Sequence, residues 1–309
     1  MKCVVFGGNG FIGSHVTDAL LAANHTVRVF DRVPEHFRSP LEGVDYITGE
    51  FSDPFAIAEA LEGMDVVYHL VSTTVPSTSN RDPVTDIETN LVASVQLLEQ
   101  MVKANMKRIV FLSSGGTVYG NTKTVPVNED HPKRPICSYA IVKIAIEHYL
   151  HMFEELHGLS PIVLRGSNPY GPRQGHRLVQ GFIGVALANM LHNEPVNIWG
   201  DGSVVRDYLY VADLAHACVL AGESSVTGVY NIGSGEEHSL NDIVKTIDES
   251  VGQAPEVVYE ASRSFDVQKI VLDISRAKEA LNWQPQCPLS EGLHLTWEWM
   301  KAFEDTPGS

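Results

Sequence analysis

The first half of the chain alternates between short apolar segments and longer amphipathic ones. Each apolar segment has four to seven residues and is followed within two positions by a glycine or a polar residue, as buried parallel strands often are. Apolar residues at helical spacing mark three longer segments, residues 14–23, 83–104 and 144–157. Repeated strand–helix units predict a parallel sheet with helices on both faces. The strands are expected at residues 3–6, 26–30, 44–48, 64–70 and 108–112.

After Pro172 the pattern changes to segments that we expect to be shared between the sheet and a smaller lobe. The sequence therefore predicts an α/β protein with a doubly wound, Rossmann-like parallel sheet over residues 1–172. A smaller C-terminal α/β lobe is expected over residues 173–309, with some of its segments returning to the sheet. No repeats, low-complexity tracts or interdomain linker stand out in the sequence.

Within the second lobe the pattern predicts a loop and helix over residues 173–193 and a strand over residues 195–199. Asp213 and Ser239 each precede a helical segment and are expected to cap it. In the last helix, residues 290–304, three apolar side chains recur at core spacing, and residues 306–309 are expected to be frayed. Those three side chains are Leu293, Trp297 and Met300.

The first predicted strand leads directly into a glycine-rich turn. Gly7, Gly10 and Gly13 are three residues apart, and a helical segment follows them. Glycines at this spacing permit a tight strand-to-helix turn, a close approach to a pyrophosphate and close packing of helix on strand. The helix N-terminus then faces the phosphate charge. The preceding strand and the following helix supply the context that such a dinucleotide motif needs.

An acidic residue ends the second predicted strand. Asp31 lies eighteen residues after Gly13, near the place where an acid holds the adenosine ribose diol. Its carboxylate would repel a 2′-phosphate and so favours NAD over NADP, whereas the nearby Arg32 and Arg38 argue the other way. An exposed turn acid is the alternative interpretation of Asp31.

Further polar residues follow the later strands, where ligands of parallel sheets collect. Glu50 could lie near the adenine, and Ser72 begins a small polar stretch that could line a pyrophosphate and ribose channel. The segment 113–120, Ser-Ser-Gly-Gly-Thr-Val-Tyr-Gly, is expected at the mouth of the site. Its hydroxyls could bind a substrate hydroxyl, and its paired glycines would leave room for a bulky ligand; a tight turn with solvated serines is the alternative.

Tyr139 and Lys143 are four residues apart, next to the helical segment 144–157. Side chains at that spacing rise from one helix face about one turn apart. A nearby ammonium group, together with a positively charged nicotinamide, favours the phenolate, so that a phenol with an ordinary pKa near ~10 could act as a base near neutral pH. Taken alone, the same pair is more often a solvated helix face.

Composition excludes several classes of function. The 309 residues carry a formal net charge of −16, which argues against a protein that coats nucleic acid. The four cysteines are far apart without metal-ligand spacing, which indicates buried free thiols in a reducing compartment. Without a signal peptide or an apolar stretch of membrane-spanning length, we expect a cytoplasmic protein.

With these residues in place, the sequence resembles the extended short-chain dehydrogenase/reductase family, in particular its nucleotide-sugar epimerase/dehydratase branch and, within it, the UDP-glucose 4-epimerases. The resemblance spans nearly the whole chain in order. It rests on the residues of the glycine turn with Asp31, on Asn90, and on segments 113–120, 139–143, 165–172, 198–202, 205–208 and 230–233.

The resemblance implies a set of site residues. Tyr139 would be the catalytic base and acid, Lys143 would bind the nicotinamide ribose and lower the tyrosine pKa, and Ser114 would be the hydroxyl beside the substrate. NAD would contact Gly7, Gly10, Phe11, Ile12, Gly13, Asp31, Arg32, Glu50, Phe51, Leu70, Ser72, Asn90, Tyr139 and Lys143. The UDP-sugar would contact Ser114, Thr117, Tyr139, Asn168, Trp199, Arg206, Arg263 and Asp266.

Some of these assignments have structural alternatives. Trp199 is about as often a core residue as a base-binding one, and Arg206 could pair with Asp207 rather than bind a phosphate. Near Ile270 many glucose-restricted relatives carry a tyrosine that limits the sugar's 2-position. The smaller isoleucine therefore leaves N-acetylated sugars open.

The sequence departs from the family pattern at two places. The position of the catalytic Ser or Thr in many relatives falls on Gly115, so Ser114 is assigned by proximity, with Thr117 as the second choice. In 4,6-dehydratases an Asp-Glu pair follows this hydroxyl, and related decarboxylases carry a Glu. Here Gly115, Gly116 and Thr117 stand there, which disfavours elimination and favours epimerisation.

The resulting hypothesis is NAD-dependent 4-epimerisation of UDP-glucose and UDP-galactose through a 4-keto sugar, by a homodimer that associates through helices near residues 83–104 and 139–157. Three alternatives remain at this point. One is the same chemistry on UDP-N-acetylglucosamine or UDP-glucuronate. Another is a nucleotide-sugar dehydratase or net oxidoreductase, and the third is a catalytically silent, NAD-binding scaffold.

Overall fold

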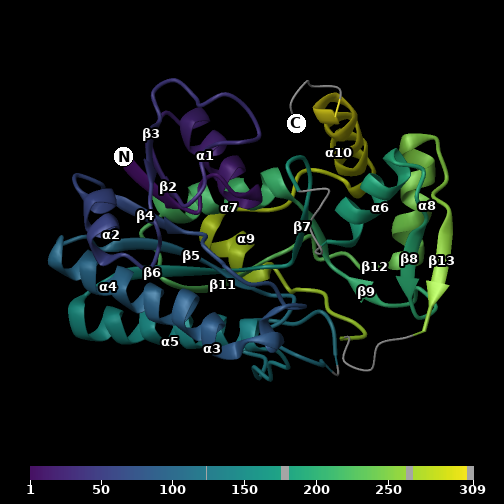
Figure 1. Cartoon of the computed structure of the whole chain (residues 1–309). Coiled ribbons are helices and arrows are strands. Elements are labelled where there is room, and N and C mark those ends of the chain that lie inside the picture. The colour runs from purple at the N-terminus through teal and green to yellow at the C-terminus, as the bar shows by residue number, and fades with distance from the viewer. Residues whose placement is uncertain (123, 175–180, 262–266, 305–309) are drawn as a thin grey trace.

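The computed structural model describes residues 1–122, 124–174, 181–261 and 267–304. Seven parallel strands form its main sheet in the order β11-β6-β5-β4-β1-β2-β3 (Figure 1). The order reverses direction at β1, as in a doubly wound sheet, so the Rossmann-like fold expected from the sequence is confirmed. The strands are β1 (Lys2–Phe6), β2 (Thr26–Asp31), β3 (Asp45–Thr48), β4 (Val66–His69), β5 (Arg108–Ser114), β6 (Ser160–Gly166) and β11 (Gly228–Ile232).

Helices cover both faces of this sheet (Figure 1). Side chains alternate along β1: Cys3 and Val5 belong to the core under α1 and α7, whereas Val4 and Phe6 belong to the core under α2, α4 and α5. Burial on both faces explains why the sequence of these strands is almost continuously apolar. The helices are α1 (Phe11–Ala22) and α7 (Val211–Glu223) on one face, and α2 (Pro54–Leu61), α4 (Ala93–Lys103) and α5 (Ser138–His157) on the other.

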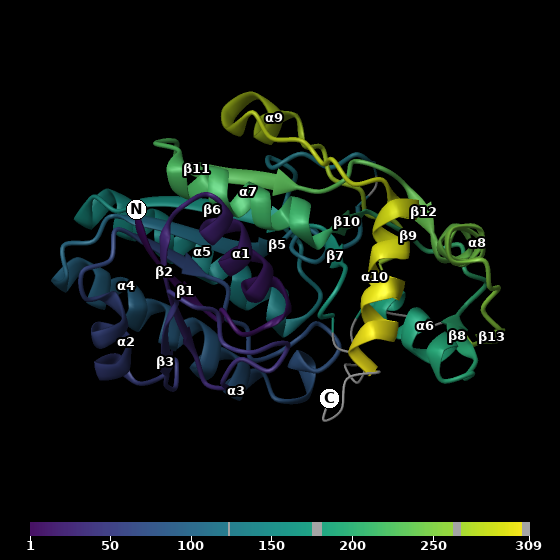
Figure 2. The ribbon, with the colours of Figure 1, turned by 90° about the horizontal axis from the view of Figure 1, so that it is seen from above.

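The second lobe lies beyond the carboxyl ends of the strands (Figure 2). Helices α6 (Phe182–Leu191), α8 (Leu240–Val251) and α10 (Leu289–Glu304) enclose its own apolar core, which includes the predicted core residues Leu293, Trp297 and Met300. The chain crosses back to the sheet through α7, β11 and α9 (Ser275–Leu281). Three small sheets complete the lobe: β7 (Asn168–Tyr170) with β10 (Tyr208–Tyr210), β8 (Val196–Trp199) with β13 (Val257–Glu260), and β9 (Val205–Arg206) with β12 (His238–Ser239).

One predicted helix cap is correct and the other is wrong. The Ser239 side chain accepts from Asp242 N, and Asp242 bonds back in a capping box at the start of α8. Asp213, by contrast, lies inside α7, where its carboxylate accepts from the backbone N–H of Cys287 at 3.0 Å. The acid therefore fastens the chain before α10 rather than capping the helix. The residues 306–309 lie outside the described part.

The segment predicted as one helix over residues 83–104 is divided. It comprises α3 (Pro83–Asp86), a π-helical turn (Ile87–Val92) and α4. Helix α5 starts at Ser138, earlier than the sequence pattern suggested, so Tyr139 and Lys143 lie in its first two turns. All four cysteines are free thiols, but only two of them, Cys3 and Cys218, are buried. In the described ranges, none of the helices combines the length and apolar character needed to span a bilayer.

Candidate active site

The glycine turn between β1 and α1 has the geometry that a dinucleotide requires. Gly7 has a φ of +85°, which other residues rarely adopt. A Cβ at Gly13 would collide with the carbonyl oxygen of Gly7, so the helix can pack this closely on the turn only because no side chain is present. The predicted roles of both glycines in shaping the turn therefore have a steric cause.

Asp31 is tied to this turn. Its Oδ2 accepts a hydrogen bond from Asn9 N at 3.0 Å, and its Oδ1 accepts one from Val33 N at 3.2 Å. The Oδ1 atom of Asn9 is buried, beside the phosphate-facing turn, and has no hydrogen-bond partner among the described residues. A buried polar atom of this kind calls for an outside partner. The open glycine turn, the acid at the end of β2 and this unsatisfied amide fit NAD.

Arg32 and Arg38, which follow Asp31 in the sequence, were the residues that argued for NADP and against NAD. Arg38 is paired with Asp18 at 2.6 Å and with Glu35 at 3.4 Å, so its guanidinium already faces two carboxylates. Arg32 is exposed. The charge of Arg38 is thus balanced within the protein, which removes one of the two arguments for a 2′-phosphate.

A cavity of about 640 Å³ opens at the carboxyl ends of the strands and extends between the two lobes. Ligands of open α/β sheets bind in this position. The cavity brings together most of the predicted site residues, from both lobes. They are Gly7, Gly10, Phe11, Ile12, Gly13, Leu70, Ser72, Ser114, Thr117, Tyr139, Lys143, Asn168, Trp199 and Arg206.

Tyr139 and Lys143 face this cavity from one side of α5, as their spacing predicted. Lys143 Nζ lies 5.7 Å from the centre of the Tyr139 ring and donates to Leu112 O at 2.9 Å. Ser114, at the end of β5, accepts from Thr117 Oγ1 at 2.8 Å and favours the phenolate form of Tyr139. Thr117, Ser114 and Tyr139 thus bring three hydroxyls to one cavity, and Ser114 is the loop hydroxyl that acts on the phenol.

Burial controls the protonation of the pair. It raises the pKa of the Tyr139 phenol to about 12, although the hydrogen bond from Ser114 acts in the opposite direction. Burial also lowers the pKa of Lys143 to about 8, against the negative charges of Asp86 and Glu147. The expectation that Lys143 lowers the pKa of the tyrosine stays a prediction for the enzyme with its cofactor bound.

The glycine pair after Ser114 shows why the hydroxyl stands at position 114. A Cβ at Gly115 would lie 2.5 Å from Leu272 Cδ1 and 2.9 Å from the carbonyl oxygen of Arg165. A Cβ at Gly116 would meet Asn168 Oδ1 no closer than 3.5 Å. Position 115 is thus closed to a side chain, whereas position 116 widens the cavity beside the tyrosine.

Several predicted ligands of the cofactor have structural roles in the chain. Phe51 is buried against Phe6, with ring centres 5.7 Å apart, and belongs to the core of the sheet. Asn90 is buried and binds Thr73 N through its Oδ1 at 2.9 Å, so it braces the loop after β4. Glu50 is exposed at the end of β3. Asp31, Arg32, Glu50, Phe51 and Asn90 are not among the residues that line the cavity within the described chain.

The far end of the cavity lies in the second lobe. Asn168 donates to Asp207 O at 2.9 Å, and Trp199 is 40% exposed, so the alternative of a core tryptophan is wrong. The Asp207 carboxylate accepts from Ser234 N at 2.7 Å and so fixes the loop after β11. Ile270 is buried in the core of the sheet and does not line the cavity, so the argument from its size about the sugar fails. Arg263 and Asp266 lie outside the described residues.

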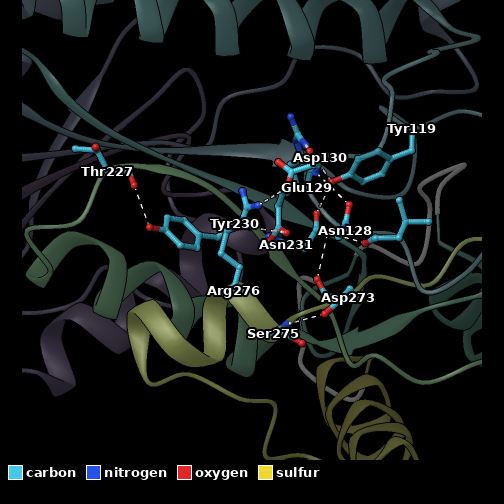
Figure 3. A network of polar contacts seen from close by, with 12 residues as sticks. Tyr119, Asn128, Glu129, Asp130, Thr227, Tyr230, Asn231, Asp273, Ser275 and Arg276 are labelled. Carbon is cyan, nitrogen blue, oxygen red and sulfur yellow. Dashed lines mark hydrogen bonds and ion pairs between the residues drawn. The ribbon is translucent and has the colours of Figure 1, made fainter.

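A buried polar network supports the site from behind. Arg165 on β6 forms an ion pair with Glu147 on α5 at 2.6 Å and donates to the phenol oxygen of Tyr119 at 2.9 Å. Figure 3 shows the continuation, in which Tyr119 donates to Asn231 at 2.6 Å and Glu129 accepts from the Asn231 backbone at 2.8 Å. The network locks α5, β6 and β11 together. Sequence reasoning did not assign these roles, because the partners are up to 112 residues apart.

A parallel sheet that brings a dinucleotide turn and a tyrosine–lysine pair to one cavity is the arrangement of a nicotinamide-dependent enzyme. The chain belongs to the NAD dependent epimerase/dehydratase family, whose model matches residues 3–233. The family expected from the sequence is thereby confirmed, and with it the cofactor NAD.

Relatives agree over nearly the full length. The putative UDP-glucose 4-epimerase of Methanocaldococcus jannaschii is 34% identical, with 96% of this chain and 98% of that protein covered. The crystal structure of Thermotoga maritima UDP-glucose 4-epimerase with UDP-glucose has a TM-score of 0.94 at 37% identity, covering 99% of this chain and 100% of that one. The Thermus thermophilus UDP-glucose 4-epimerase complex with NAD has a TM-score of 0.91 at 34% identity, covering 99% and 100%.

Proposed function

We propose that the protein is an NAD-dependent 4-epimerase that interconverts UDP-glucose and UDP-galactose. The observation that carries this function is the shared cavity: the glycine turn, the Tyr139–Lys143 pair, Asn168 and the second-lobe residue Arg206 all line it. A nucleotide sugar that reached from Arg206 to Tyr139 would place its hexose beside the phenol.

Each residue of the site has its own role in the proposed reaction. Tyr139 takes the proton from the sugar 4-hydroxyl and later returns it, and Ser114 orients the phenol. Lys143 holds a positive charge beside the phenol and binds the ribose of the cofactor. Asn168, Trp199 and Arg206 hold the UDP-sugar. Bound NAD supplies the hydride acceptor and donor, so that the sugar passes through a 4-ketose and returns with either configuration.

Because burial raises the pKa of Tyr139, this residue needs an additional positive charge nearby to act as a base. A phenol with a pKa of about 12 stays protonated near neutral pH when only the protein surrounds it. A positive charge close to Tyr139 is needed to form the phenolate, and the nicotinamide end of NAD⁺ carries one. The base is therefore active only in the holoenzyme, which prevents proton abstraction before the cofactor is in place.

The environment of Ser114 favours epimerisation over elimination. Loss of water from the sugar requires an acid that protonates the leaving hydroxyl. Positions 115 and 116 are glycines, and a side chain at Gly115 has no room. Residues 114–117, which correspond to the segment that carries this acid in dehydratases, contain only the hydroxyls of Ser114 and Thr117 as polar side-chain groups.

A homodimer is part of the proposal. Exposed apolar side chains gather on α3, the π-helical turn and α5, within the two segments where the sequence predicted the contact. Val84 is 64% exposed, Ile141 55% and Leu156 68%. Apolar surface of this kind marks interaction sites. Ile141→Asp with Leu156→Asp should give a monomer in analytical ultracentrifugation, and a wild-type monomer contradicts the dimer.

The cytoplasmic location and the lobe boundary after residue 172 stay predictions.

The decisive test is incubation of the purified protein with UDP-glucose, without added NAD, followed by chromatographic separation of the two epimers. We expect an equilibrium mixture with UDP-galactose, since the cofactor is regenerated in each turnover. Tyr139→Phe should lower kcat by about 10²–10⁴ while UDP-sugar binding persists. Tyr149→Phe, which alters a half-exposed tyrosine of the same helix, is the matched control.

The products of the same incubation distinguish the proposed function from its alternatives. Net release of NADH identifies an oxidoreductase, and a 4-keto-6-deoxy sugar identifies a dehydratase. Turnover of UDP-N-acetylglucosamine or UDP-glucuronate in place of UDP-glucose keeps the chemistry and changes the sugar. A protein that holds NAD but turns over none of these sugars contradicts the proposal.

A further inference from the structure

A buried carboxylate lies beneath the start of the catalytic helix. Asp86, the last residue of α3, is 0% exposed. Its Oδ2 accepts a hydrogen bond from Ser138 Oγ at 2.6 Å, and its Oδ1 accepts one from Thr74 Oγ1 at 2.6 Å. Taking a carboxylate out of water is costly even when it is hydrogen-bonded, so an acid in this position is a candidate for a functional role.

The π-helical turn holds this acid in place. Asn90, in that turn, donates to Asp86 Oδ1 at 3.0 Å and accepts from Thr73 N at 2.9 Å. The carboxylate is therefore bound from three segments: the loop after β4, the π-helical turn and α5. Turns of this type often occur at functional sites.

Asp86 connects the cavity wall with the catalytic helix. Thr74 lines the cavity, and Ser138 is the residue directly before Tyr139. The backbone N–H of Ser138 also donates to Asn80 Oδ1 at 2.8 Å. The first turn of α5 is thus held through both the amide and the hydroxyl of one residue, and Tyr139 cannot shift without breaking these contacts.

Asp86 also acts on Lys143 through its charge. Among the described residues, the titratable groups that interact with Lys143 are Tyr139 and Glu147 on α5, His69 on β4 and Asp86 on α3. The negative charge of Asp86 favours the ammonium form, against the desolvation that lowers the pKa of Lys143 to about 8. The same charge adds to the burial that raises the pKa of Tyr139. Burial keeps His69 neutral by lowering its pKa well below the usual value.

The two acids near Lys143 differ in their partners. Glu147 is bound by the guanidinium of Arg165, whose positive charge offsets its own. In the described part of the chain, the Asp86 carboxylate accepts from the hydroxyls of Thr74 and Ser138 and from the amide of Asn90, all of them uncharged. The charge of Asp86 therefore reaches Lys143 with less compensation than that of Glu147 does.

We propose that Asp86 is a positioning residue for the epimerase reaction: it fixes Tyr139 through Ser138 and keeps Lys143 protonated through its negative charge. The inference rests on the proposed roles of Tyr139 and Lys143. It adds a residue that belongs neither to the cofactor set nor to the sugar set.

Asp86→Asn tests both parts, because it keeps the shape of the side chain and removes the charge. We expect kcat to fall by about tenfold to a hundredfold, since small misplacements of a catalytic group cost this much. KM for the UDP-sugar should change by less than about threefold, because Asp86 does not touch the substrate. The alkaline limb of the kcat profile should move to lower pH, because Lys143 then loses its proton earlier.

Two further variants separate position from charge. Ser138→Ala leaves the charge in place, so kcat should fall without displacement of the pH profile. Glu88→Gln removes a charge from the exposed side of the same π-helical turn and should alter neither quantity. If Asp86→Asn does not fold, Ser138→Ala decides: a reduced kcat supports the inference, and a wild-type kcat overturns it.

Failure of this inference differs from failure of the proposed function. A wild-type protein that does not epimerise any UDP-sugar overturns the function itself. An active wild type, an inactive Tyr139→Phe and a normal Asp86→Asn overturn only the role of Asp86. Lower activity of Asp86→Asn with an unmoved pH profile shows a purely structural acid and equally contradicts the inference.

Discussion

Gly115→Ser is the most informative single substitution in the loop beside the tyrosine. It installs a hydroxyl residue at the position where many relatives of the family carry one. In this chain the new Cβ would stand 2.5 Å from Leu272 Cδ1 and 2.9 Å from Arg165 O. The glycine cannot move away freely, because its N–H donates to Gly166 O at 2.7 Å and joins it to β6.

The cost follows from these contacts. Leucine Cδ1 is the end of a flexible side chain and can rotate, but the carbonyl of Arg165 is part of a central strand. Overpacking a well-filled core costs about 1–3 kcal/mol. For a chain of 309 residues, roughly 1.5 °C of melting temperature corresponds to each kcal/mol, so Tm should fall by about 2–5 °C.

Thermal unfolding and the epimer assay together measure the outcome. Gly115→Ser should melt earlier and show no gain in kcat, because Ser114 already occupies the place next to the phenol. Gly116→Ser is the matched control: its Cβ meets Asn168 at an ordinary distance of 3.5 Å, so stability should be preserved. A Gly115→Ser protein with wild-type Tm, and with activity that persists when Ser114 is changed to Ala, refutes the assignment of Ser114.

Three further predictions concern charge. Arg165→Met leaves Glu147 buried without its partner and should cost about 3–5 kcal/mol in urea unfolding, whereas a loss below 1 kcal/mol contradicts the role of the pair. Burial lowers the pKa of His15, which hydrogen-bonds Pro172 O at 2.8 Å, to about 4. The unfolded chain binds a proton at His15 at higher pH than the folded chain does. The free energy of unfolding should therefore decrease by up to about 3 kcal/mol as the pH falls from 6.5 to 4. Urea unfolding of His15→Asn at both pH values should show a smaller decrease. Asp31→Ser should weaken NAD⁺ binding by about tenfold or more and improve the relative binding of NADP⁺ in calorimetry, and an unchanged preference excludes Asp31 as the ribose acid.

Much of the fold could be predicted from local patterns. Continuous apolar segments mark buried parallel strands, and the glycine spacing of the first turn reflects steric limits within a few residues. The pair of Tyr139 and Lys143 needed only the helical period to be placed on one face. The boundaries were less certain: α5 begins at Ser138, before its apolar period becomes visible, and the expected helix over residues 83–104 contains a π-helical turn.

The sequence alone determined which chemistry the chain can carry out, because a turn, a helical spacing and a hydroxyl loop are local properties. The tertiary structure decided that position 115 cannot carry the hydroxyl, since the space at Gly115 is taken by Leu272 and Arg165. It also decided the protonation of Tyr139 and the place of Asp86, which meets Ser138 across 52 residues of sequence. Desolvation and contacts between distant segments arise only when the chain has folded, so no pattern of neighbouring residues could reveal them.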